Sequence, residues 1–398
     1  MNNFTYIFNF GWSVNNIGAQ LTAYALQEVL KNFSYNSLVI NNPRIHEKSC
    51  RFNKYIMFSK SIKNIFEAEK FCSKTDTFIT GSDQVFRPIY IKGKEYQYLL
   101  DFALPTSRKI AFSASFGVDK ESFLEENSPE VIEHMKNSLR SFDFISVREK
   151  SGVEICKDVL GVEAEWIIDP VFVLDRSKYD ELITNANGKI LKQVQNDTIV
   201  SYVLDTNKEY KKAYKYLSEK YGGEVVETAN SNISVESWLK SIRDCKLFVT
   251  DSFHGMCFAI IFNKPFICIS NKSRGAARFE SIVEMLGIEN QCINSIDETY
   301  TKDCIFKVDY EKVNQRIEEE RQKGLAFLQK ALESPIGKFE EKQAVRTQYL
   351  EETVCKLEQQ ANLKYQIKKE LWNLWLIIFH KYLPKTMKNL IRRIRGSK

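Results

Sequence analysis

Short apolar runs rich in β-branched and aromatic residues alternate with amphipathic segments in the first part of the chain. The apolar runs are typical of buried strands, which we expect at residues 4–8, 37–40, 77–80, 109–113, 142–147 and 165–168. The spacing of apolar positions predicts helices at residues 19–33, 128–139 and 149–160. This alternation favours a largely parallel sheet covered by helices on both faces.

A second series of strands and helices follows a polar stretch at residues 179–197. Strands are expected at residues 198–204, 223–228, 247–250 and 265–270, with helices at 208–221, 235–244 and 255–262. The sequence therefore predicts an α/β fold of two similar lobes that face a cleft. We expect the first domain at residues 1–185 and the second at residues 186–335.

The remaining segment, residues 336–398, is expected to form a helical tail, and helix is expected throughout the chain beyond Lys312. Its most apolar run, residues 371–379, is too short to span a bilayer. After Pro384, apolar residues share one helical face and Lys and Arg residues the other, which is typical of a helix lying at a membrane surface. Alternatively, this helix contacts another chain, in which case the protein could be a homo-oligomer.

Charge separates this tail from the rest of the chain. The 398 residues carry a formal net charge of +6, but residues 361–398 alone carry +9, which leaves −3 for the body. A mildly acidic body argues against nucleic-acid binding, and the basic tail points to an anionic membrane. Nine scattered cysteines without metal-ligand spacing, and an N-terminus without signal-peptide features, indicate a cytoplasmic protein held peripherally on the inner face of the membrane.

Common signatures of cofactor, metal or hydrolase sites are absent from the sequence, so candidate chemistry rests on four polar segments that follow predicted strands. The first is Gly81-Ser82-Asp83-Gln84, whose polar side chains could form hydrogen bonds with the hydroxyls of a ligand. Alternatively, the segment is a turn that ends a strand. The second contains Arg148, where a strand ends and a helix begins. It could bind an anion or form a surface ion pair.

The third segment places His254 beside Asp251 and Ser252, directly after a strand. The two neighbours could cap the next helix or orient the imidazole, and His254 is a candidate acid or base, although a lone His is often structural. The fourth segment contains Arg274 and continues to Arg278. This segment could bind a phosphate or a carboxylate, or it could be a basic loop exposed to solvent. Asp169-Pro170 is interpreted as a domain-closing turn.

The chain resembles the polysaccharide pyruvyl transferase family. The similar stretches occur in the family's order and are residues 15–30 (NNIGAQLTAYALQEVL), 81–85 (GSDQV), 146–150 (SVREK), 169–170 (DP), 250–265 (TDSFHGMCFAIIFNKP) and 278–279 (RF). The resemblance implies two Rossmann-like lobes arranged as in GT-B glycosyltransferases. It also implies transfer of a pyruvyl group from phosphoenolpyruvate to two sugar hydroxyls, which forms a ketal and releases phosphate. Phosphoenolpyruvate is then a donor substrate, and no separate cofactor is implied.

The candidate residues fit this reaction. His254 is the expected general acid, and Arg148, Arg278 and Arg274 are the expected anion ligands. Gly81, Ser82, Asp83 and Gln84 would face the acceptor sugar or complete the donor site. Asp251 and Ser252 are also expected to bind substrate. Many family members have an Arg two residues before the motif His, where this chain has Ser252, so Arg274 or Arg278 is the candidate replacement.

Two other functions fit the same features. One is a GT-B-type glycosyltransferase that uses a nucleotide sugar, and the other is a non-catalytic, membrane-docked scaffold for glycan assembly. For the transferase, the expected acceptor is a sugar of a cell-surface glycan or of its lipid-linked precursor.

Overall fold

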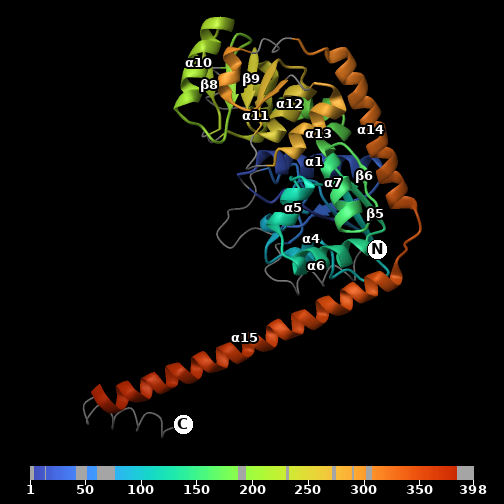
Figure 1. The fold of residues 1–398 in the computed structure, drawn as a ribbon, viewed down its shortest axis with the longest axis vertical. Helices are drawn as coiled ribbons and strands as arrows, with labels where there is room; N and C mark the ends of the chain where they lie inside the picture. The colour runs from blue at the N-terminus through green and yellow to red at the C-terminus, as the bar shows by residue number, and fades with distance from the viewer. Residues whose placement is uncertain are drawn as a thin grey trace. The chain divides into compact units, whose positions relative to one another are not determined.

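The computed structural model describes residues 4–13, 15–41, 52–60, 77–186, 194–229, 233–270, 275–288, 291–301 and 307–382, without the side chains of residues 357, 360 and 371–382. The chain divides into two units, Met1–Val345 and Arg346–Lys398. The first unit holds two sheets, each flanked by helices (Figure 1).

Among the described residues, the first sheet has six parallel strands in the order β2-β1-β3-β4-β5-β6. The strands are β1 (Thr5–Phe8), β2 (Ser37–Val39), β3 (Thr77–Thr80), β4 (Arg108–Ala114), β5 (Phe144–Val147) and β6 (Glu165–Trp166). Its helical segments are α1 (Ile17–Asn32), α3 (Pro88–Ile91), α4 (Glu95–Tyr98), α5 (Lys120–Glu126), α6 (Pro129–Arg140), α7 (Lys150–Glu154), the π-helical turn η1 (Ile155–Val159), α8 (Pro170–Val173) and α9 (Arg176–Ile183).

The second sheet has five described strands, again all parallel, in the order β11-β10-β9-β7-β8. The strands are β7 (Ile199–Tyr202), β8 (Val225–Glu227), β9 (Leu247–Thr250), β10 (Phe266–Ile269) and β11 (Cys292–Ile293). The helices are α10 (Lys208–Tyr221), α11 (Val235–Asp244), α12 (Phe253–Ile261), α13 (Ala277–Leu286) and the 3₁₀ helix η5 (Ile296–Tyr300). The expected fold of two α/β lobes is confirmed.

Both sheets follow the same winding rule. In each, the second strand lies on one side of the first, and the later strands lie on the other side. The winding direction therefore reverses between β1 and β3 in one lobe and between β7 and β9 in the other. Ligands of open α/β sheets bind beyond the carboxyl ends of strands at such a reversal, so the topology points to the loops after these four strands.

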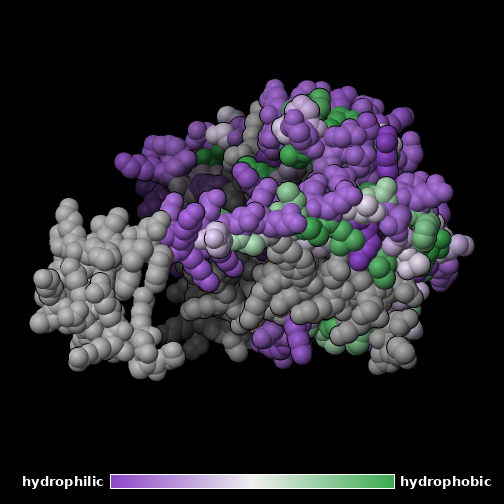
Figure 2. Space-filling view, turned by 90° about the horizontal axis from the view of Figure 1, so that it is seen from below, coloured by the Kyte–Doolittle hydropathy of each residue, from purple (hydrophilic) through white to green (hydrophobic). Residues whose placement is uncertain are grey.

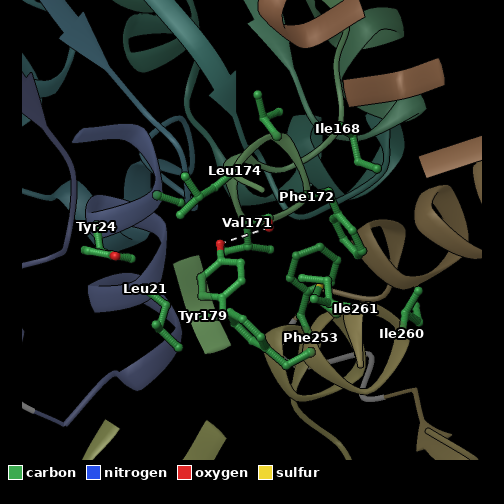
Figure 3. Packing of buried hydrophobic residues seen from close by; sticks show 14 of the residues in the cluster. Leu21, Tyr24, Ile168, Val171, Phe172, Leu174, Tyr179, Phe253, Ile260 and Ile261 are labelled. Atoms are coloured by element: carbon green, nitrogen blue, oxygen red, sulfur yellow. Dashed lines mark hydrogen bonds between the residues drawn. The ribbon is translucent and has the colours of Figure 1, made fainter. Parts of the chain in front are cut away.

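A continuous apolar core joins the two lobes. One cluster of buried side chains contains Leu21 of α1, Phe172 of α8, Tyr179 of α9 and Phe258 of α12. Figure 3 shows Tyr179 among side chains of these helices, with its hydroxyl donating to the Val171 carbonyl at 2.9 Å. Helices α1 and α12 also carry polar residues at their first turns. Their packing in this shared core therefore brings polar side chains of the two lobes close together.

The elements that differ from expectation lie mainly in polar or connecting stretches. Part of the predicted polar junction is helix α9, whose Tyr179 is fully buried, and helix α13 has no counterpart among the predicted elements. The helical region is interrupted between α14 (Tyr310–Glu333) and α15 (Phe339–Tyr382). Pro335 lies in this interruption, and a proline favours such a break because it lacks the backbone N–H that a helix interior requires.

Helix α14 returns to the first lobe (Figure 1). Its Phe327 ring lies 6.1 Å from that of Phe112 in β4 and 6.2 Å from that of Phe144 in β5. The C-terminal part of the first unit is therefore packed on the first sheet.

None of the helices within the described ranges is both long and apolar enough to cross a bilayer. The predicted surface helix after Pro384 lies outside the described residues. On the face shown in Figure 2, hydrophilic side chains cover most of the coloured surface, and hydrophobic ones form small groups.

Candidate active site

A cavity of about 550 Å³ lies at the winding reversals of both sheets. The first lobe lines it with Phe10, Trp12, Ser13 and Asn16 after β1, with Asp83 and Gln84 after β3, and with residues of α3, α4 and the turn between them. The second lobe contributes Leu204 after β7, residues 251–254 after β9, and Arg278 of α13. Its volume is within the range of small-molecule sites in proteins.

His254 lies in the first turn of α12 and is 6% exposed. Its Nε2 is 3.0 Å from Thr22 Oγ1 in α1, and the Thr22 hydroxyl donates to the Gly18 carbonyl at 2.9 Å. Because that hydroxyl has one proton to donate, this geometry places the hydrogen of the neutral imidazole on Nε2. The Nδ1 atom then has the lone pair that can exchange a proton.

Gly18 leaves room for the other side of this ring. A Cβ atom at position 18 would lie 2.2 Å from His254 Nδ1, so a side chain there is incompatible with the observed imidazole position. Asn16, which caps α1 by accepting from the Ala19 N–H at 3.0 Å, lines the cavity nearby. The first turn of α1 and the first turn of α12 therefore meet at His254.

Behind His254 is a buried network of charges around Arg148. Nη1 of Arg148 donates to Asp169 Oδ2 at 2.5 Å, and Nη2 donates to Asp83 Oδ1 at 3.2 Å. Asp169 Oδ2 is also 3.7 Å from His254 Nε2, where it can balance a positive charge on the imidazole. Burial alone would raise the pKa of both carboxyls, but the cationic neighbours outweigh it and lower the pKa of Asp83 and of Asp169.

Glu149 is fully buried beside this network. One carboxylate oxygen accepts from Ser115 Oγ and from the backbone N–H groups of Phe116 and Gly117, at 3.0, 2.5 and 2.7 Å. Burial raises the pKa of Glu149. Its bonds hold the loop after β4, where Gly117 packs against Gln84.

Arg278 is a buried cation on the part of the cavity wall that the structure describes. Burial, followed by the nearby charge of Arg148, lowers the pKa of Arg278 to about 10. The Phe253 ring is in contact with both guanidiniums, 4.7 Å from that of Arg148 and 5.1 Å from that of Arg278. A bound anion beside Arg278 would offset the mutual repulsion of the two cations.

The predicted site residues divide by position. Asp83, Gln84, Asp251, Ser252, His254 and Arg278 line the cavity. Arg148 and Ser82 lie buried behind its wall, and Ser82 Oγ donates to the Ser113 carbonyl at 2.7 Å. Gly81 is the residue where the backbone passes Phe112 closely, with a φ of +117°. Arg274 lies outside the described residues.

Two of the lining residues hold local structure. The carboxylate of Asp251 accepts from the backbone N–H groups of Leu204 and Asp205, at 2.8 and 3.1 Å, which joins the loops after β7 and β9. Ser252 caps α12 by accepting from the Gly255 N–H at 3.3 Å. Within the described ranges, no group of three or more His, Cys, Asp or Glu side chains is arranged to hold a metal ion.

Sequence reasoning missed Thr22 and the role of Asp169. Asp169 caps α8, as a turn residue would, by accepting from the Val171 N–H at 3.1 Å. Its second oxygen, however, pairs with Arg148. An Asp at the end of a strand was the available signal, because side chains at strand ends face the ligand edge of a parallel sheet. For Thr22, nothing in the helical pattern of α1 distinguishes it from a core residue.

Comparisons with known proteins give both fold and family. The putative UDP-N-acetylglucosamine 2-epimerase from Listeria monocytogenes is 10% identical, with a TM-score of 0.52 over 83% of this chain and 97% of that one. The UDP-GlcNAc 2-epimerase from Neisseria meningitidis is 11% identical, with a TM-score of 0.48 over 88% and 100% of the two chains. At such identities the likeness concerns the fold alone, and the likeness to the Listeria protein agrees with the expected GT-B-like class.

A comparison with curated protein sequences gave no match. The sequence model of the polysaccharide pyruvyl transferases, in contrast, matches residues 16–273. This match includes the first turn of α1, the loop after β3, Arg148, Asp169 and the first turn of α12, which together surround His254. The chain belongs to the polysaccharide pyruvyl transferase family.

Proposed function

We propose that the protein transfers a pyruvyl group from phosphoenolpyruvate to two hydroxyls of a sugar, which forms a ketal and releases phosphate. The acceptor belongs to a cell-surface glycan or to its lipid-linked precursor. The observation that carries this proposal is that His254 lines the same cavity as Arg278, while its Nδ1 lies beside Gly18 of α1. Family membership supports the reaction class.

The reaction requires one carbon protonation and two additions. In its imidazolium form, His254 gives the Nδ1 proton to the methylene carbon of phosphoenolpyruvate, and positive charge develops at the carbon that bears the phosphate. One sugar hydroxyl adds to that carbon, the phosphate leaves, and the second hydroxyl closes the ketal. The two sugar hydroxyls release two protons. One returns to His254 and restores the general acid, and the other is taken by the phosphate.

The charges around the cavity suit this donor. In our proposal, Arg278 and the N-terminal turn of α1 bind its carboxylate and phosphate, and Arg274 is a second cationic ligand. Arg148 acts from behind the wall by neutralising Asp83 and Asp169. Asp83 and Gln84, with Gly81 and Ser82 shaping their loop, face the acceptor hydroxyls. Asp251 and Ser252 hold the loop that carries His254.

The C-terminal segment suggests where the reaction takes place. Residues 361–398 carry a net charge of +9, against −3 for the rest of the chain. We propose that this tail binds anionic lipid on the cytoplasmic face of the membrane, near a lipid-linked acceptor.

The test combines ligand binding with turnover. Thermal stability is measured with phosphoenolpyruvate and with a panel of nucleotide sugars, because a ligand at 100 times its Kd stabilises the native state by about 2.7 kcal/mol. Phosphate release is then measured with a panel of sugars. We expect phosphoenolpyruvate to stabilise the wild type and His254→Ala alike, and phosphate release to be lost in His254→Ala.

The matched control is His134→Ala, since His134 pairs with Asp101 at 2.8 Å and does not line the cavity. The His134→Ala variant should still release phosphate. Stabilisation by a nucleotide sugar, without an effect of phosphoenolpyruvate, would instead identify a glycosyltransferase. Full activity of His254→Ala would contradict the assigned acid.

A further inference from the structure

The cavity has a buried end and an open end with different chemistry. We call Asp83, His254 and Arg278 the floor, because they are 5%, 6% and 7% exposed. We call Ile89, Tyr90, Lys92, Lys94 and Leu204 the mouth. Ile89, Tyr90 and Leu204 are 65%, 40% and 39% exposed, which is unusual for apolar side chains gathered at one cavity. The proposed function assigns no role to the residues of the mouth.

Four of the five mouth residues belong to the first lobe, where contacts with neighbouring residues hold them in place. Lys92 and Lys94 flank Gly93 in the turn between α3 and α4, and Gly93 has a φ of +79° that favours glycine. Glu95 fastens this turn by accepting from the Gly93 N–H at 2.8 Å. The ammonium of Lys94 lies 5.3 Å from the centre of the Trp12 ring. This contact directs Lys94 along the cavity wall.

Tyr90 is also supported from behind. The guanidinium of Arg87 lies 5.3 Å from the Tyr90 ring and donates to both oxygens of Glu126, at 2.7 and 3.1 Å. Leu204 belongs to the second lobe, where Asp251 holds its backbone N–H. The mouth thus presents apolar surface from both lobes, with an aromatic ring on one side.

The charge of the mouth is positive, because it contains Lys92 and Lys94. Two carboxylates also line the cavity: Asp83 pairs with Arg148, and Asp251 accepts from the backbone N–H groups of Leu204 and Asp205. An apolar surface with an aromatic ring suits the C–H face of a sugar ring, and lysines suit a carboxylate or a phosphate.

We propose that the mouth is the acceptor subsite and that the acceptor is a sugar with a negatively charged substituent, held by Lys92 and Lys94 with its ring against Tyr90 and Ile89. This inference rests on the proposed function. A three-carbon donor does not fill a cavity of about 550 Å³, and its reacting carbon must lie at the floor beside His254. A glycan acceptor must project into solvent, so it occupies the open end.

The test uses three probes that share one sugar ring: methyl glucoside, methyl glucuronide and glucose 1-phosphate, with the corresponding galactose and mannose compounds. Binding is measured by calorimetry in the full chain carrying His254→Ala, with phosphoenolpyruvate bound, because we expect this variant to bind the donor without turning it over. The substitutions below are made in the same chain, which is their reference. For at least one sugar, we expect a charged probe to bind about tenfold or more tightly than its neutral counterpart. Comparison of the carboxylate and phosphate probes identifies which anion is preferred.

The variants separate charge from ring contact. The double substitution Lys92→Gln and Lys94→Gln should remove the preference for the charged probes, and Tyr90→Ala should weaken all three probes of a set. Tyr90→Phe should keep the binding of the reference chain, since it retains the ring. Lys211→Gln, on the exposed face of α10 away from the cavity, is the matched control for loss of a lysine.

The binding of phosphoenolpyruvate is measured for every variant and should be unchanged. Weaker binding of phosphoenolpyruvate to the double lysine variant, with unchanged sugar binding, would assign the lysines to the donor and overturn the inference. Equal binding of charged and neutral probes by the His254→Ala reference chain would also overturn it. A failure of the proposed function has a different signature, because the wild type would then neither bind phosphoenolpyruvate nor release phosphate from it.

Discussion

Replacing Asp169 with Asn removes one negative charge from the buried network around Arg148. Asp169 Oδ2 accepts from Arg148 at 2.5 Å, Oδ1 accepts from the Val171 N–H at 3.1 Å, and the residue is 1% exposed. Asparagine has nearly the same shape and can keep the bond to Val171. The substitution therefore tests the charge of Asp169 rather than its packing.

Removing one partner of a buried ion pair typically costs about 3–5 kcal/mol, because the remaining charge is left uncompensated. Arg148 keeps Asp83 at 3.2 Å, so we expect the lower end, a loss of about 3 kcal/mol in the free energy of unfolding.

This loss should depend on pH in a defined direction. Burial opposes ionisation of Asp169, but the nearby imidazole of His254 and the charge of Arg148 hold the pKa of Asp169 well below its usual value. A lowered carboxyl pKa stabilises the folded state above the unfolded value of about 3.9 and ceases to do so as the pH falls toward the folded-state pKa. The difference between wild type and variant should be constant near neutral pH and shrink below about pH 4.

The assay is urea unfolding followed by tryptophan fluorescence at pH 7. The matched control is Asp175→Asn, because Asp175 caps α9 from an exposed position and asparagine is an equally good cap. Its effect should stay within about 0.5 kcal/mol. If Asp169→Asn and Asp175→Asn unfold at the same urea concentration, the argument for a charge-compensating Asp169 is wrong.

Three further predictions concern His254, a buried lysine and the tail. Gly18→Ala would place a Cβ 2.2 Å from His254 Nδ1 and displace the imidazole, so kcat for phosphate release should fall about 100-fold, and a wild-type kcat would contradict the assigned position. Burial lowers the pKa of Lys109 to about 8, and the unfolded chain therefore binds more protons between about pH 8 and 10. Wild-type stability should rise across that interval relative to Lys109→Met, and urea midpoints with the same pH dependence in both proteins would refute this. A chain that ends at Leu363 should lose sedimentation with anionic liposomes that the full chain shows, and equal sedimentation would withdraw the proposed membrane contact.

Much of the fold was predictable because burial leaves a local pattern. The expected helices at residues 208–221 and 235–244 and the strand at 247–250 coincide with α10, α11 and β9. Parallel strands covered on both faces appear as continuous apolar runs, and the helices repeat their apolar positions at a spacing of three or four. Helix α9 was not predicted because most of its residues are polar, although its Tyr179 is buried in the shared core.

The candidate site was predictable only in part. Sequence motifs at strand ends located His254, Asp83, Gln84 and Arg278, all of which line the cavity. They did not distinguish Arg278, on the wall, from Arg148, which is bound to carboxylates behind it. Exposure and pairing of a charged side chain depend on what packs against it, and no local pattern reports that.

By itself, the sequence determined two α/β lobes, the family, and the presence of a His where a strand meets a helix. The tertiary structure alone decided that His254 meets Thr22, which is 232 residues away in the chain, and that Arg148 pairs with both Asp83 and Asp169. It also decided which aromatic and basic residues surround the open end of the cavity. The physical reason is that hydrophobic periodicity reflects burial within one element, whereas a site is made where loops from two sheets converge, and that convergence is set by packing between elements distant in sequence.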